Sequence, residues 1–147
     1  MLEPFAFDYA LMVFSSTLGV VQFVAVKNNL FGIMIFRTRL VVTKFSAIAL
    51  VIAPFVWFFF LGEPRNIPDT GPGLEANTQT IVFASSAAIA IAVTFAISSI
   101  VNHSWGSNYK TKDEDFAEDD VEGMSVFQKT TFFWATIRIF IKSQGSP

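Results

Sequence analysis

The sequence predicts an all-α membrane protein with three transmembrane helices and a C-terminal amphipathic helix. Only 15% of the 147 residues are charged, whereas typical soluble domains carry about 25%. Hydrophobic residues make up 52% of the chain, 18 residues are phenylalanine, and the mean hydropathy is +0.51. So few polar side chains cannot cover the surface of a small soluble domain. Asp, Glu, Lys, Arg and His are also absent from three long stretches, 9–26, 45–61 and 81–101.

Each uncharged stretch is long enough to cross a bilayer, because a transmembrane helix needs about 20 mainly apolar residues, with roughly 17 to 25 tolerated. We expect spans at about 9–26, 41–61 and 80–101, which together form a membrane domain over 1–105. The second span reaches 41 if the Lys44 side chain extends back to the interface.

Charge in the two short loops predicts the orientation. The loop between the first two spans carries four basic residues and no acid, whereas the next loop has one basic and three acidic residues. The positive-inside rule therefore places the first loop and the C-terminus in the cytoplasm and the N-terminus outside. The residues before the first span include acids but no base, unlike a secretory signal, so we expect this span to be retained. We expect a multi-pass protein of the cell membrane.

The first two spans contain a few residues with specific expectations. Gln22 is the only amide within a span, and we expect it to hydrogen-bond to a neighbouring helix. Pro54 predicts a kink in the second span, and Trp57 with the phenylalanines after it predicts an aromatic belt at the outer interface. Ionisable residues are absent from all three uncharged stretches, which argues against a self-contained pump or ion-coupled transporter.

Small residues recur at every fourth position of the third span. One row consists of Ala84, Ala88, Ala92 and Ala96, and a second row of Ser86, Ala90, Thr94 and Ser98. Such rows let helix backbones approach closely. The alanine row is our candidate for helix packing, either within the chain or with another subunit.

The loop between the first two spans contains an apolar segment, 30–36, that is too short to cross the membrane. We expect this segment to lie along the cytoplasmic interface, with Arg37, Arg39 and Lys44 reaching anionic headgroups. Continuation of the first helix beyond the membrane is the alternative.

Two further segments follow the third span. An acidic cytoplasmic linker is expected over 106–123, and it holds seven of the twelve acids. An amphipathic interfacial helix is expected over 124–143, suited to the inner leaflet or to a partner subunit. The alternation over 137–142 also fits a strand. The candidate membrane-interface residues of the whole chain are Arg37, Arg39, Lys44, Trp57, Phe133, Trp134, Arg138 and Lys142.

The sequence contains few of the residue types on which catalytic sites depend. The chain has no cysteine and one histidine, His103, which excludes thiolate chemistry and bis-histidine haem ligation within one chain. We expect His103, with Asn102 and Ser104, to cap the inner end of the third span. No catalytic, cofactor-binding or metal-binding residues are predicted. A net charge of −2 gives no indication of the basic surface that binds nucleic acid, so we expect no nucleic-acid partner.

We therefore expect a non-catalytic accessory or anchoring subunit of a larger integral-membrane complex. Its expected partners are the lipid bilayer and other membrane subunits or further copies of the chain. A small homo-oligomeric channel or transporter is the alternative, and a membrane-embedded enzyme is the third possibility. The polar residues available to line a channel are Ser15, Ser16, Thr17, Gln22, Ser86, Thr94 and Ser98.

Overall fold

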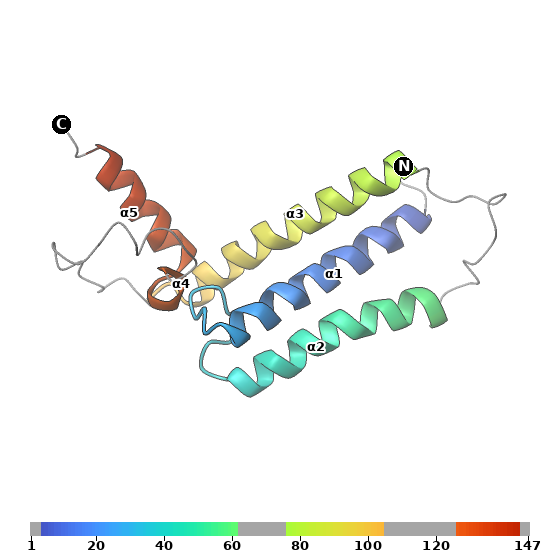
Figure 1. The fold of residues 1–147 in the computed structure, drawn as a ribbon, viewed down its shortest axis with the longest axis horizontal. Helices are drawn as coiled ribbons and strands as arrows, with labels where there is room; N and C mark the ends of the chain where they lie inside the picture. Colours follow the sequence, from blue (N-terminus) through green and yellow to red (C-terminus); the bar gives the residue numbers. More distant parts are fainter. Residues whose placement is uncertain (1–3, 62–75, 105–125, 145–147) are drawn as a thin grey trace. The chain divides into compact units, whose positions relative to one another are not determined.

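All regular elements in the described part of the chain are helices. The structure is a computed structural model that describes residues 4–61, 76–104 and 126–144. The predicted all-α fold class is confirmed, whereas the acidic linker over 106–123 lies outside the described residues. The elements are α1 (Pro4–Lys27), α2 (Leu40–Val56), the π-helical η1 (Trp57–Leu61), α3 (Ala76–Val101), α4 (Val126–Lys129) and α5 (Phe132–Gln144) (Figure 1).

Three helices are long and apolar enough to cross a membrane: Phe5–Lys27, Leu40–Leu61 and Ala76–Val101. Their most apolar windows have mean hydropathies of 1.8, 2.1 and 2.2, and at most 28% of any window is buried inside the protein. Apolar side chains exposed to this extent need lipid around them, since soluble proteins rarely leave large apolar patches uncovered. The predicted three-span, multi-pass architecture is therefore confirmed at this level.

The chain divides into two compact units, which we describe separately. The first unit comprises Met1–Val21 and Phe45–Ala92, and the second comprises Gln22–Lys44 and Val93–Pro147.

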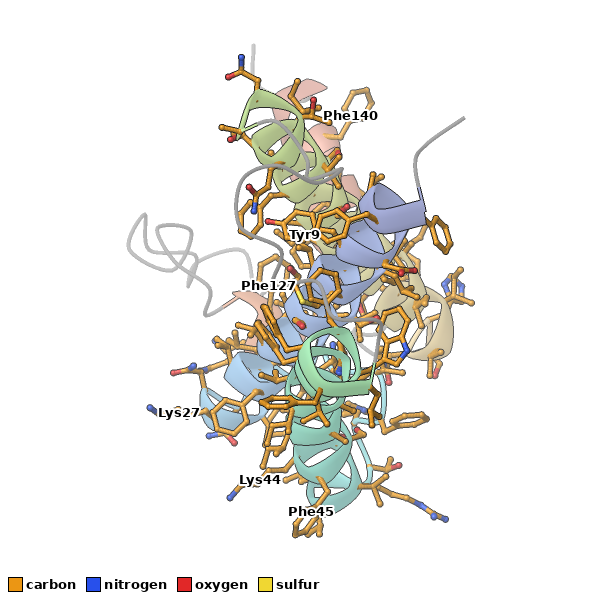
Figure 2. The ribbon with its side chains drawn as sticks, turned by 90° about the vertical axis from the view of Figure 1, so that its right-hand side faces the viewer. Tyr9, Lys27, Lys44, Phe45, Phe127 and Phe140 are labelled. Carbon is orange, nitrogen blue, oxygen red and sulfur yellow. The ribbon has the colours of Figure 1, made fainter. Side chains whose placement is uncertain are left out.

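The core of the first unit is formed by Met12 and Val13 of α1 together with Phe58 of η1. Around it pack the partly buried side chains Phe5, Tyr9, Trp57 and Ala87. The ring of Phe58 lies 5.7 Å from that of Phe5 and 6.2 Å from that of Tyr9, centroid to centroid. Figure 2 labels Tyr9 among the side chains of this unit. Trp57, which we expected in an interfacial belt, therefore also contributes to a core.

Helices α1 and α2 approach closely in the first unit at Gly19. A Cβ atom at this position would lie 2.8 Å from the carbonyl oxygen of Ala47 and 2.9 Å from the backbone nitrogen of Val51. Both distances are shorter than atomic contact allows, and Ala47 itself is fully buried. Only glycine permits this separation of the two backbones.

Helix α2 continues through Pro54 and changes to the π-helical η1 at Trp57. Proline lacks the N–H that would bond to the carbonyl of the preceding turn. A wider π-helical turn is one of the recognised accompaniments of such an irregularity. This turn presents Phe58 to the core while Phe59 and Phe60 stay exposed.

In the second unit, α1 ends at Lys27 in a Schellman motif. Asn29 has the left-handed φ of 56°, which asparagine tolerates better than most residues. The Leu30 N–H donates to the Ala25 carbonyl at 2.8 Å, and the Asn29 N–H donates to the Val26 carbonyl at 3.4 Å. Leu30 and Ala25 are both buried, as the apolar contact of this motif requires. Continuation of the first helix into the loop is therefore wrong.

The apolar segment 30–36 folds into the second unit. The exposed fractions of Leu30 and Ile33 are 3%, and Met34 is completely buried. We expected the segment to lie along the membrane surface, but these three side chains are covered by protein. Phe36, by contrast, remains exposed.

The C-terminal region forms two helices where we expected one over 124–143. Thr130 and Thr131 separate α4 from α5, and the Ala135 N–H donates to the Thr131 carbonyl at the start of α5. The break lies where the chain contacts Gly32, since the Thr130 carbonyl is close enough to overlap a Cβ placed at Gly32. The strand alternative over 137–142 is wrong, since this stretch is helical.

Candidate functional site

A buried amide of α1 holds the folded loop in the second unit. Gln22 is 3% exposed, and its Nε2 donates to the Ile33 carbonyl at 3.0 Å. Its Oε1 accepts a hydrogen bond from the Ile35 N–H at 2.9 Å. We expected Gln22 to bond to a neighbouring helix, whereas it satisfies loop backbone. One amide thus supplies both a donor and an acceptor to a backbone that has no regular secondary structure.

A second buried amide, just past the end of α3, holds the same loop. The Nδ2 of Asn102 donates to the Met34 carbonyl at 2.8 Å and to the Ser98 carbonyl at 3.0 Å. Gln22 and Asn102 therefore bond to three consecutive residues, 33–35, and we call this arrangement the amide clamp. Non-helical backbone is tolerated near membrane depth only where protein or a water-lined cavity satisfies its polar groups.

The start of the C-terminal region is fixed to the same unit by backbone and ring contacts. The Gly32 N–H donates to the Phe127 carbonyl at 2.7 Å, and Ser99 Oγ accepts from the Phe133 N–H at 3.3 Å. The rings of Phe95 and Phe132 stack at 4.7 Å with an interplanar angle of 3°. Phe95 also stacks at 6.1 Å on Phe127, which Figure 2 labels.

The histidine lies among aromatic side chains at the end of α3. Its carbonyl accepts a hydrogen bond from Trp134 Nε1 at 2.8 Å, and its ring lies 5.9 Å from Phe133 and 5.7 Å from Trp134. We expected His103, together with Asn102 and Ser104, to cap α3, and it is the Asn102 side chain that bonds to a carbonyl of the last turn. The histidine residue instead links α3 to α5 through its backbone.

The two small-residue rows of α3 lie in different environments. In the first unit, Ser86 and Ala90 are buried, and in the second unit Thr94 and Ser98 are buried. The candidate packing residues, by contrast, are all exposed: Ala84, Ala88 and Ala92 in the first unit and Ala96 in the second. The row that packs within the chain is therefore the second one.

The predicted membrane-interface residues are exposed to different extents. Arg39 and Lys44 are exposed, Arg37, Trp57 and Trp134 are half-buried, and Phe133 is 44% exposed. Figure 2 shows the side chains of Lys27 and Lys44 extending away from the ribbon. Arg138 and Lys142 belong to α5, but their side chains lie outside the described part of the structure.

Arg37 lines two cavities of the second unit. One has a volume of about 250 Å³ and is lined by Ile35, Phe36, Arg37, Thr38, Val101, Asn102 and Ser104. The other is more open, has a volume of about 450 Å³, and is lined by Phe31, Arg37, Thr38 and Gln128. Together their linings present a guanidinium, hydroxyl and amide groups and apolar side chains. Among the described residues, no three or more His, Cys, Asp or Glu side chains gather as a metal site would require.

Sequence reasoning missed three residues that organise these contacts, namely Gly19, Asn29 and Gly32, and it expected Asn102 only as part of the cap of α3. Gly19 carries a usable signal, because it is the single glycine within the predicted spans and small residues mark close helix approach. Asn29 carries one as well, since asparagine is common at the left-handed position after a helix. Gly32 contacts residues far along the chain, and so does Asn102 at Met34, and no local pattern indicates these distant partners.

Comparisons with known protein families, with curated proteins and with solved structures find no match for this chain.

Proposed function

We propose that this chain is a non-catalytic accessory or anchoring subunit of a larger integral-membrane complex, and that α3 is the helix that packs against the partner. The observation that carries the proposal is the exposed alanine row of the first unit, Ala84, Ala88 and Ala92. These residues lie on one face of α3, while Ser86 and Ala90 on another face are buried within the unit.

Small side chains matter in a bilayer because lipid is as apolar as leucine, so burial alone does not bring helices together. Association depends instead on close packing, and Cβ-sized side chains allow two backbones to approach. The first unit already uses this principle at Gly19, where α1 and α2 approach closely. The exposed alanine row offers a second surface of the same type to a helix from another subunit.

The channel alternative is less well supported. A pore between identical subunits needs polar side chains on the outer surface of the subunit. Of the residues available for such a stripe, Gln22, Ser86, Thr94 and Ser98 are all buried within their own units. Gln22 is, moreover, committed to loop backbone on both its donor and its acceptor side. The enzyme alternative depends on carboxylates, and Asp69 and Glu75 lie outside the described residues.

In this proposal the chain lies in the cell membrane with its N-terminus outside, and α5 lies at the cytoplasmic interface. The loop charges support the orientation through the positive-inside rule. Exposed aromatic side chains on α5, namely Phe132, Phe133 and Phe140, support contact with lipid or with a partner.

The test compares two alanine-to-leucine variants on exposed helix positions of the first unit. Ala88→Leu enlarges the alanine row of α3, and Ala49→Leu makes the same change at an exposed position of α2. Each full-length protein is extracted in a mild detergent, and the complex is measured by native mass spectrometry. We expect a stoichiometric foreign subunit with the wild type and with Ala49→Leu. With Ala88→Leu we expect its recovery to fall by about ten-fold, since overpacking at a tight contact costs about 1–3 kcal/mol.

Recovery of a lone monomer or homo-oligomer from the wild type would contradict the proposal. Unchanged recovery of the partner with Ala88→Leu would also contradict it, because the contact would then not involve the alanine row. So would an equal loss of the partner in both variants at unchanged melting temperatures, because the effect would then not be specific to that row.

A further inference from the structure

The smaller cavity of the second unit lies where an apolar span ends. Val101 is the last residue of α3, and Asn102 and Ser104 follow it in the cavity wall. The rest of the lining is formed by residues 35–38, of which Ile35 is the last of the three residues held by the amide clamp. Because the apolar stretch ends at Val101, this cavity lies at the level where hydrocarbon gives way to lipid headgroups.

The lining combines groups that suit an anion with groups that suit a hydrocarbon chain. Arg37 supplies a permanently charged guanidinium, whose planar set of donors matches a phosphate. Thr38 and Ser104 supply hydroxyl groups. Phe36 and Val101, which are 51% and 58% exposed, place apolar surface beside the polar groups. A ligand that satisfies both kinds of group is amphipathic.

The charge of the loop beside the cavity also favours an anion. Residues 27–44 of the second unit contain no Asp or Glu. They contain four basic residues: Lys27, Arg37, Arg39 and Lys44. A concentration of basic residues next to the membrane attracts anionic lipids by about 1 kcal/mol for each residue close to the surface.

The geometry points to this cavity as a binding site for the phosphate headgroup of an anionic phospholipid. Arg37 binds the phosphate, Thr38 and Ser104 donate hydrogen bonds to its oxygens, and the acyl chains pass over Phe36 and Val101. Asn102 is a positioning residue, since its Nδ2 is bonded to the Met34 and Ser98 carbonyls and fixes one wall against the other. The volume of about 250 Å³ is below the roughly 300–1,000 Å³ of sites for drug-sized ligands, so it fits one headgroup rather than a whole lipid.

The experiment titrates the purified full-length protein in detergent with phosphatidylglycerol or phosphatidylcholine and counts bound lipid by native mass spectrometry. Arg37→Gln removes the charge from the cavity. Arg39→Gln is the matched control, because it removes the same charge from the same loop at an exposed position outside the cavity lining. Thr38→Val removes a hydroxyl group without altering charge, and its control is Thr136→Val, at an exposed threonine of α5.

We expect the wild type to retain one phosphatidylglycerol in preference to phosphatidylcholine. Arg37→Gln should weaken this retention by about ten-fold or more, and Thr38→Val by about five-fold, as expected for charge-assisted hydrogen bonds. Thr136→Val should retain phosphatidylglycerol within about two-fold of the wild type. Arg39→Gln should do so at high salt, where the general electrostatic attraction lost with its charge is screened in every variant. Melting temperatures identify any variant that fails to fold. If Arg37→Gln fails to fold, Thr38→Val still tests the site, because Thr38 is at an exposed position.

Three results would overturn the proposal. One is equal retention of the two lipids by the wild type. Another is an equal effect of Arg37→Gln and Arg39→Gln at high salt together with no effect of Thr38→Val, which would indicate diffuse attraction only. The third is displacement of the lipid by millimolar inorganic phosphate, which would assign the cavity to a soluble anion.

Discussion

At the residue scale, two buried amides, Gln22 and Asn102, supply hydrogen bonds to backbone groups that a helix would satisfy elsewhere in this chain. Each donates to a carbonyl of the segment 33–35, and Gln22 also accepts from the Ile35 N–H. Backbone groups left without partners in an apolar environment are costly. The clamp thus allows a non-helical segment to be buried between helices.

Replacing Gln22 should reveal that cost. In Gln22→Leu the size of the side chain is nearly kept, but the Ile33 carbonyl and the Ile35 N–H lose their partners. We expect a loss of about 2 kcal/mol or more, since each unsatisfied buried group costs about 1–3 kcal/mol. Thermal unfolding in a mild detergent measures the change.

The control is Gln79→Leu, an equal replacement at an exposed position near the start of α3. It should change stability by no more than about 0.5 kcal/mol. If both variants melted at the temperature of the wild type, the amide clamp would not hold the loop.

The sequence indicates the polarity of Gln22 but not its partner. An amide in an otherwise apolar span must find a hydrogen bond, which we could predict. The partner depends on the loop folding back, and the loop folds back because Asn29 ends α1 in a left-handed conformation. A Schellman motif at Asn28–Asn29 could have been predicted from residue preference, and it would have excluded continuation of the helix.

At the scale of elements, the ends of the spans follow from charge and the contacts between them follow from glycine. The uncharged stretches predict all three long helices, because a single run of about 20 apolar residues can satisfy its own backbone hydrogen bonds in lipid only as a helix. The break between α4 and α5 could not be predicted this way. It lies where Thr130 approaches Gly32, a contact between residues far apart in the sequence.

Gly19→Ala should separate α1 from α2 in the first unit. At an open helical position this change would stabilise by about 1 kcal/mol, because alanine has the higher helix propensity. Here the new Cβ would lie 2.8–2.9 Å from the backbone of Ala47 and Val51 and from Leu50 Cβ. Backbone cannot move aside as a side-chain tip can, so we expect a net destabilisation of about 1–3 kcal/mol.

Thermal unfolding in detergent again gives the measurement. Val20→Ile, which adds one carbon at the exposed neighbouring position, should leave the melting temperature within about 1 °C of the wild type. A stabilised Gly19→Ala variant would mean that the close approach is absent in solution.

At the scale of the whole molecule, composition indicates a membrane protein, and the charge of the loops predicts its orientation. The charged residues all lie outside the three uncharged stretches, so the low overall charge averages an uncharged membrane part with ordinary polar segments. Function could not be predicted from the sequence in the same way, because the candidate surfaces consist of alanine, aromatic and basic residues that also occur in membrane proteins for structural reasons.

The two ends of α3 provide a direct test of orientation. The chain has no cysteine, so single cysteines can be introduced without a background. In intact cells, Asn77→Cys at the start of α3 should react with a membrane-impermeant thiol reagent. Ser104→Cys beyond its end should react only after permeabilisation, as the positive-inside rule requires. Both positions are exposed. Labelling of Ser104→Cys alone in intact cells would reverse the proposed orientation.

The hydrogen bond between the Gly32 N–H and the Phe127 carbonyl has a consequence for biosynthesis. A ribosome makes the chain from its N-terminus, so Gln22 can bond to Ile33 and Ile35 soon after they emerge. The bond from Asn102 to Met34 waits for a further 68 residues, and Gly32 waits longer still. The loop near the start of the chain is therefore completed only when the C-terminal helices arrive, and premature termination of translation before Phe127 would leave the Gly32 N–H without this partner.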